Sequence, residues 1–253
     1  MKTVAIIGAA GGAGVTTVAA HLAAGLAASA RPVLAFDANP DNLMRLHLGM
    51  SWDDPRGFAQ ALASGTDWHE AAYQSAGGVD FVPFGDLSSD AELSRLADYM
   101  TAHPHWLRSA MGTLALPADT IVVCDCPRLP SPFSAQVLAM ADLVLVVMEA
   151  DPVSYAVATR MVTRANGPGM APALLLLNQF EPARALHRDI SVLLRTAFRS
   201  TLSPVTIHRD AHVGEALGCK QTVFEFAPPS QAAHEFAALS TWVLARLGRE
   251  AGN

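Results

Sequence analysis

The chain contains 253 residues, of which 51% are apolar and 16% are charged, and its formal net charge is −6. A chain of this length and composition can bury a large core without disulfides or a structural metal. The acidic balance argues against nucleic acid as a partner, because binding its phosphate backbone needs clustered lysine and arginine. Only two lysines occur, Lys2 and Lys220, so a cation beside a nucleotide must be an arginine, a metal ion or a group from another protein.

Short apolar runs typical of strands alternate with longer helical patterns along the whole chain. The predicted strands cover residues 4–8, 33–37, 79–84, 120–124, 143–148, 174–178 and 204–208. The predicted helices cover residues 14–28, 54–64, 91–113, 134–141, 154–165, 184–198 and 231–247. Strands that are apolar on both faces and separated by crossover helices predict an α/β fold, a doubly wound, mostly parallel sheet flanked by helices. Because no linker or repeat interrupts the pattern, residues 1–253 are expected to form one domain.

A glycine-rich loop follows the first predicted strand, and residues 10–17 read Ala-Gly-Gly-Ala-Gly-Val-Thr-Thr. Glycines in such a loop let main-chain N–H groups curl round a phosphate, and Thr16 and Thr17 offer hydroxyls to Mg²⁺ and to an α-phosphate. Ala10 and Val15 stand where phosphate loops carry lysine. The cation that neutralises charge during phosphoryl transfer is therefore missing, and we expect nucleotide binding with little or no hydrolysis.

Two aspartates lie at the carboxyl ends of other predicted strands. Asp37 ends the strand 33–37 and precedes Ala-Asn-Pro-Asp-Asn, and Asp125 directly follows the strand 120–124 and precedes Cys-Pro-Arg. The carboxyl ends of parallel strands meet at one edge of a sheet, so both carboxylates should lie near the loop. Together with Thr16 they describe a nucleoside triphosphate site that contains Mg²⁺.

Three alternatives remain open from the residues alone. An NAD-dependent oxidoreductase can begin with a similar glycine turn, with Asp37 binding the ribose hydroxyls. The turn can also serve only close helix–strand packing, and a scaffold that binds no nucleotide is consistent with Val15.

These segments resemble the deviant P-loop ATPases of the MinD and ParA group, and within that group the branch that accompanies bacterial cellulose secretion. The resemblance extends over nearly the whole chain. Its most specific segments are residues 37–46, Asp-Ala-Asn-Pro-Asp-Asn-Leu-Met-Arg-Leu, and residues 207–210, Ile-His-Arg-Asp.

The resemblance implies an ATP-sandwiched homodimer and assigns a role to each matching position. Thr16, Asp37 and Asp125 would hold Mg²⁺, the two carboxylates through water. Asn178 would read the edge of the adenine. The implied nucleotide-binding set is Gly11, Gly12, Ala13, Gly14, Val15, Thr16, Thr17 and Asn178. No catalytic residue is assigned, because Asn39 stands where hydrolysing members orient the attacking water with an aspartate.

The resemblance also implies partners, namely a second copy of the chain, the cytoplasmic parts of the cellulose synthase complex and a small companion protein. The apolar run at residues 4–8 is too short for a signal peptide, and no run approaches the ~20 residues that cross a bilayer, so we expect a cytoplasmic protein. Contact with the inner membrane or the cell pole should be indirect. The last predicted helix lacks the basic face of a membrane-binding tail and should pack against the sheet.

Overall fold

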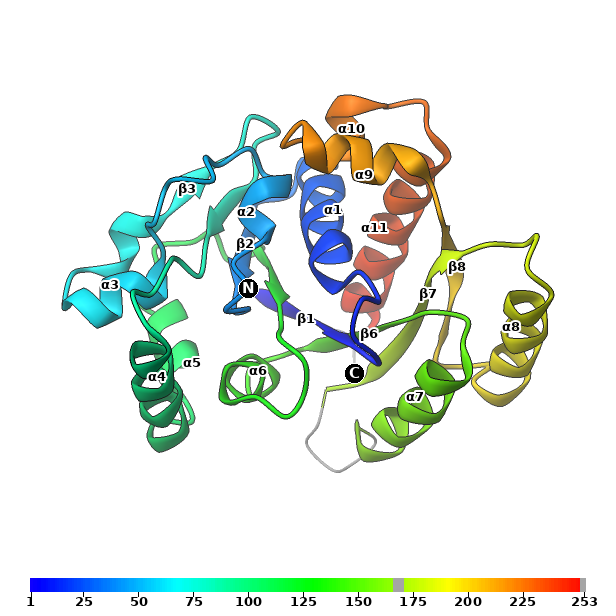
Figure 1. Cartoon of the computed structure of the whole chain (residues 1–253), viewed down its shortest axis with the longest axis horizontal. Coiled ribbons are helices and arrows are strands. Elements are labelled where there is room, and N and C mark those ends of the chain that lie inside the picture. Colours follow the sequence, from blue (N-terminus) through cyan, green and yellow to red (C-terminus); the bar gives the residue numbers. More distant parts are fainter. Residues whose placement is uncertain (166–170, 251–253) are drawn as a thin grey trace.

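A computed structural model describes residues 1–165 and 171–250 and shows a central sheet with helices on both faces (Figure 1). The strand order in the eight-stranded sheet is β3-β4-β2-β5-β1-β6-β7-β8. All neighbouring strands are parallel except β3 and β4. The strands are β1 (Lys2–Gly8), β2 (Val33–Asp37), β3 (Tyr73–Gln74), β4 (Asp80–Val82), β5 (Ile121–Asp125), β6 (Leu143–Met148), β7 (Ala173–Phe180) and β8 (Leu202–His208).

Each face of the sheet carries its own helices and its own apolar cluster (Figure 1). One face is covered by α1 (Val15–Ala28), α2 (Met44–His47), α9 (Ala211–Gly218), α10 (Val223–Phe226) and α11 (Gln231–Glu250). The other is covered by α3 (Phe58–Ser64), η1 (Trp68–Ala71), α4 (Asp90–Ala102), α5 (Trp106–Met111), α6 (Pro132–Leu138), α7 (Pro152–Ala165) and α8 (Ala185–Ala197). Along β1, Val4 and Ile6 face α1, whereas Ala5 and Ile7 face the opposite cluster, because successive side chains of a strand point to opposite faces.

The predicted fold class is confirmed, but several boundaries were wrong. The predicted helix 91–113 is interrupted between α4 and α5 at Pro104, which has no N–H to donate and disfavours a helical conformation in the residue before it. The predicted helix 54–64 begins only at Phe58, after Pro55 and Gly57. The edge strand β3 and the short helices α2, η1, α9 and α10 were missed, since elements of two to eight residues carry little periodicity.

The last helix packs as expected. Phe236, Leu239 and Val243 of α11 are fully buried in the same cluster as α1. Within residues 1–165 and 171–250, no helix has both the length and the apolar character that crossing a membrane requires. The helix therefore belongs to the core of the fold.

Candidate nucleotide-binding site

The glycine-rich loop lies between the end of β1 and the start of α1, and its amides are free. Within the described part of the chain, none of the main-chain N–H groups of residues 11–17 donates to another protein atom. Gly12 and Gly14 adopt positive φ angles of 80° and 86°, which glycine tolerates without strain. The first turn of α1 carries no acidic side chain that would compete with an anion. Free amides at a helix N-terminus form a site that favours phosphate.

Two side chains from the end of β7 hold the carbonyls of the loop. The Asn178 Nδ2 amide donates to the Ala13 carbonyl at 2.7 Å, and the Gln179 Nε2 amide donates to the Gly12 carbonyl at 2.9 Å. The C=O and N–H of one planar peptide group point in opposite directions. Anchoring these two carbonyls on β7 therefore turns the following amides, those of Ala13 and Gly14, away from β7 and toward the space that a phosphate would fill.

Gly14 leaves no room for a larger residue. A Cβ atom at this position would lie 2.5 Å from Asn178 Nδ2. The next side chain, Val15, packs back against Gly8 at the end of β1 and contacts the apolar cluster around α1. Val15 thus joins the hydrophobic packing, and its side chain contributes no polar group to the loop.

The predicted magnesium ligands lie together. Asp37 and Asp125 are register partners at the carboxyl ends of β2 and β5 and are both fully buried. The Thr16 hydroxyl donates to Asp125 Oδ2 at 2.6 Å, while Asp125 Oδ1 is buried without a hydrogen-bond partner. Asp37 accepts the main-chain N–H of Asn39 at 3.0 Å and that of Met44 at 3.3 Å. Three oxygen-bearing side chains therefore converge beside the loop.

Burial dominates the electrostatics of the two carboxylates. It raises the pKa of Asp125 to about 7, against the opposing effect of the Thr16 and Asn39 side chains. Burial and the charge of Asp125 together raise the pKa of Asp37 well above its ordinary value. Two adjacent buried acids with one unpartnered oxygen form a donor set that fits Mg²⁺, which prefers carboxylate, hydroxyl and water oxygens. After donating its proton to Asp125, Thr16 still has lone pairs to offer a cation.

Two buried histidines lie behind Thr17. His21 Nδ1 donates to the Thr17 carbonyl at 2.7 Å, and His21 Nε2 accepts the Val223 N–H at 3.1 Å, so the ring is neutral with its proton on Nδ1. His47 Nε2 lies 3.4 Å from the Thr17 hydroxyl. Burial lowers the pKa of His21 to about 4 and that of His47 to about 3. Both rings are therefore uncharged neighbours of the predicted α-phosphate contact.

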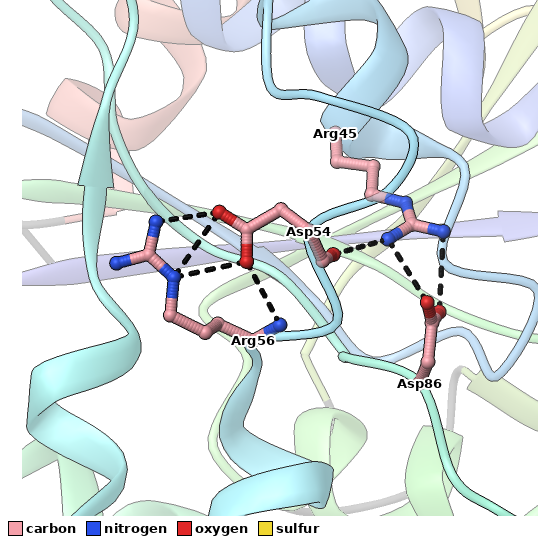
Figure 2. A network of polar contacts seen from close by, with 4 residues as sticks. All are labelled: Arg45, Asp54, Arg56 and Asp86. Carbon is pink, nitrogen blue, oxygen red and sulfur yellow. Dashed lines mark hydrogen bonds and ion pairs between the residues drawn. The ribbon is translucent and has the colours of Figure 1, made fainter.

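An ion-pair network holds the segment that follows Asp37 (Figure 2). The Arg45 guanidinium, buried at 4% exposure, contacts Asp86 Oδ1 at 3.1 Å and Oδ2 at 3.3 Å, and donates to the Asp54 carbonyl at 2.7 Å. The Asp54 carboxylate binds Arg56 through Nε at 2.9 Å. Asn42, at a φ of 52°, also donates to Asp86 at 3.0 Å. These contacts connect the segment that carries Asn39 to the loop after β4.

A pocket of about 580 Å³ opens beside the phosphate loop. Its lining includes Gly12, Gly14, Thr17, Asn178 and Gln179, together with residues 207–211 at the end of β8 and the start of α9. Such a pocket is large enough for a nucleoside. The place of Asn178 in this lining is consistent with its predicted contact with the adenine, which stays a prediction.

Arg209 is the one arginine or lysine among the described residues that line this pocket. Its Nη2 donates to Gln179 Oε1 at 3.0 Å, and its Nε pairs with Glu181 at 3.0 Å. Gln179 itself has a positive φ of 53° and connects Arg209 to the Gly12 carbonyl. By contrast, Arg128 lines a different pocket.

The structure thus brings the loop residues, Asp37, Asp125 and Asn178 to one edge of the sheet. Sequence reasoning missed Gln179, Arg209 and His47. The signal in the sequence that points toward Arg209 is the segment of residues 207–210, one of the two most specific segments of the resemblance. Nothing in the sequence marks Gln179 or His47, whose roles depend on contacts across the fold.

The fold and the loop define a P-loop nucleoside triphosphatase fold of the MinD and ParA type. MinD of Pyrococcus horikoshii, complexed with Mg-ADP, superposes with a TM-score of 0.76 at 20% identity and covers 98% of each chain. McdA of Cyanothece, in complex with ATP, superposes with a TM-score of 0.76 at 18% identity, covering 97% of this chain and 96% of that chain. At these identities the likeness establishes the fold.

The sequence relatives establish the family. A family profile described as cellulose biosynthesis protein BcsQ matches residues 1–244. The cellulose biosynthesis protein BcsQ of Escherichia coli K12 is 30% identical over 250 residues, which cover 96% of this chain and 94% of the relative. The chain belongs to the BcsQ family.

Proposed function

We propose that residues 1–253 form one nucleotide-binding domain that binds ATP and Mg²⁺, dimerises around the nucleotide and supports the bacterial cellulose synthase complex as an assembly or localisation factor. The observation that carries this proposal is the loop whose N–H groups have no protein partner, beside the cluster of Thr16, Asp37 and Asp125. Bound Mg²⁺ would supply the positive charge that two buried carboxylates and a triphosphate share.

The pocket chemistry favours ATP over GTP. A guanine base is usually read by a carboxylate that accepts its N–H groups, and Asp210 is the one carboxylate residue in the described lining. Both Asp210 oxygens are engaged, Oδ1 by the main chain and ring of His212 at 3.0 and 2.7 Å, and Oδ2 by Ala232 N at 3.1 Å. Asn178, whose Nδ2 is held by Ala13, offers its oxygen to the exocyclic amine of adenine.

Weak or absent hydrolysis follows from the chemistry of three positions. Ala10 and Val15 carry no charge, and Val15 packs into the apolar cluster. Asn39 has an amide that cannot act as a general base, and its Oδ1 accepts the Asp41 N–H at 3.2 Å. Arg209 is the cation that partly replaces the missing lysine in binding. The expected state is therefore a long-lived nucleotide complex.

Dimerisation and the partners are supported by the family and by exposed apolar side chains after Asp37. Leu43 is 39% exposed and Trp52 is 54% exposed. Contact with the cytoplasmic parts of the synthase complex, a small companion protein and indirect recruitment to the inner membrane or cell pole complete the proposal. Deleting the gene should reduce cellulose output, and a Thr16→Ala copy should fail to restore it.

Calorimetry with ATP and Mg²⁺ tests the central claim. The wild-type chain should bind one ATP per protomer, Thr16→Ala should lose most of the heat, and Thr16→Ser should retain it because the serine keeps the hydroxyl. Gel filtration should show a dimer with ATP and a smaller species without it. Absence of ATP binding by the wild-type chain would favour the nucleotide-free scaffold instead.

The NAD-dependent oxidoreductase alternative lacks support from the geometry. A ribose hydroxyl would have to reach the Asp37 carboxylate directly, and Asp37 is fully buried, with both its oxygens accepting main-chain N–H groups. The proposed contact of Asp37 with Mg²⁺ instead runs through a water molecule, which needs only a remaining lone pair. Titration with NADH should accordingly give no binding.

A further inference from the structure

A second pocket lies on the opposite face of the sheet from α1. Its volume is about 470 Å³, and it is bounded by β1, β6, α6 and α7. Figure 1 shows α6 and α7 on the face opposite α1 and α11. Ile7, Val144 and Val146 form its floor, with Leu138 of α6 and Val157 of α7 at its sides. We call it the α6–α7 pocket.

Two arginines are the only polar side chains among the described residues that line this pocket. Arg128 precedes α6, and Arg160 lies on α7. Neither makes a hydrogen bond or an ion pair with any residue that the structure describes. Arg195 and Arg199 also have no partner among the described residues, so what distinguishes Arg128 and Arg160 is the largely apolar pocket that they share. Two unpaired guanidinium groups on one pocket attract an anion.

The lining also excludes several classes of ligand. A sugar or a nucleotide base would bury most of its hydroxyl, amide or ring-nitrogen groups against aliphatic side chains, because the two arginines are the only polar side chains in the described lining, and such burial is costly. A purely apolar ligand would use the floor but leave both arginines unpaired. A ligand with an aliphatic body and one anionic head group would match both the apolar lining and the two arginines.

We propose that the α6–α7 pocket binds a single amphiphilic anion, an alkyl chain of about ten carbons that ends in a carboxylate or phosphate. The chain lies on Ile7, Val144 and Val146, and the head group lies between Arg128 and Arg160. Each added methylene strengthens binding by roughly fourfold until the pocket is full, because its apolar surface leaves water.

The pocket shares its boundary with the nucleotide site. Gly8 and Ala9, which line it, lead directly into the phosphate loop, and Arg128 lies three residues after Asp125. An occupant that shifts these residues changes the affinity for ATP, and ATP then changes the affinity for the occupant by the same factor. This coupling rests on the proposed nucleotide function, whereas binding of the amphiphile does not.

The test measures binding to the full chain without nucleotide, below the micelle concentration, by calorimetry. Decanoate and decyl phosphate should bind one per chain, and inorganic phosphate should not bind. Octanoate, which is two methylenes shorter, should bind about sixteenfold more weakly than decanoate. Decanol should bind at least tenfold more weakly than decanoate. Arg128→Gln and Arg160→Gln should each weaken decanoate binding by about tenfold. Arg195→Gln, which alters an unpaired arginine on a different pocket, is the matched control and should change nothing.

Two further variants and one membrane arm complete the test. Val157→Trp should fill the pocket and abolish decanoate binding while the unfolding midpoint stays near that of the wild type. Equal binding of decanol and decanoate, or no effect of either arginine variant, would overturn the proposal. Adsorption of the protein to anionic phospholipid vesicles, if it is lost in both arginine variants, would also overturn the proposal, because it would show that Arg128 and Arg160 bind a membrane surface. Failure of ATP binding with intact decanoate binding would refute only the nucleotide function.

Discussion

His21 should make the folded state sensitive to acid. Its ring is neutral in the fold, donating to Thr17 and accepting from Val223, and stacks on Phe236 with ring centroids 4.5 Å apart. Burial lowers its pKa from 6.5 to about 4. As the pH falls, the unfolded chain therefore binds the proton first, and the stability that neutral His21 contributes is lost between pH 6.5 and pH 4.

The magnitude follows from that shift. At pH 5 an unfolded histidine is almost fully protonated while His21 in the fold is about one tenth protonated, so the free energy of unfolding falls by roughly 2 kcal/mol relative to pH 7.5. His47, whose pKa burial lowers to about 3, acts in the same direction as His21. The raised pKa values of Asp37 and Asp125 act in the opposite direction, since those groups bind protons more readily in the fold. A comparison of variants is needed to isolate the contribution of His21.

Urea unfolding of the wild type and of His21→Gln at pH 7.5 and pH 5 makes that comparison. Glutamine can donate and accept as the imidazole does but does not titrate, and both proteins retain His47 and the two aspartates. The stability advantage of the wild type should shrink by about 2 kcal/mol at pH 5. His105→Gln, at an exposed histidine, should show no such change. An advantage that stays constant between the two pH values would refute the argument.

Three further perturbations have definite expectations. Gly14→Ala places a methyl group 2.5 Å from Asn178 Nδ2 at a residue with a positive φ, so it should destabilise the fold by roughly 2 kcal/mol and weaken ATP binding. Adding Asn178→Ala to this variant should recover part of the stability, because it removes the side chain that the methyl group meets. Thermal unfolding of the single and double variants measures this recovery. Val15→Lys should strengthen ATP binding, measured by calorimetry, by about tenfold or more. A phosphate assay should detect no ATP hydrolysis by this variant, and measurable phosphate release would contradict the prediction. Asp86→Ala should lower the free energy of unfolding in urea by roughly 1–2 kcal/mol more than Arg45→Met does. Removing Asp86 leaves the buried Arg45 guanidinium without its ion-pair partner, whereas removing Arg45 leaves a carboxylate that is half exposed to water.

Local rules in the sequence were sufficient for the main architecture. The apolar runs that became β1, β2, β5, β6 and β7 are buried on both faces, and that pattern is readable without tertiary information. Edge elements were less accessible, since β3 has two residues and pairs with β4 by a contact that no local periodicity reports. At Pro104 the sequence did contain the needed signal, because proline breaks helices, but the predicted helix 91–113 was wrongly extended across it.

The candidate site divides in the same way. The glycine loop, Thr16, Asp37 and Asp125 could be placed from sequence because each follows a strand whose carboxyl end must reach the same edge of a parallel sheet. The contact by which Gln179 anchors the loop could not be predicted from sequence, since it depends on the positive φ of Gln179 and on the Gly12 carbonyl, 167 positions away along the chain.

The sequence by itself therefore determined the parallel sheet, the phosphate loop and the loss of its lysines, because these depend on residue type and on spacing along the chain. Only the tertiary structure decided which way the loop amides point, that Arg209 lines the pocket beside the phosphate loop, and that Arg128 and Arg160 line one pocket with an apolar floor. Those features arise from side chains distant in sequence that share one small volume, and no local pattern records such a meeting.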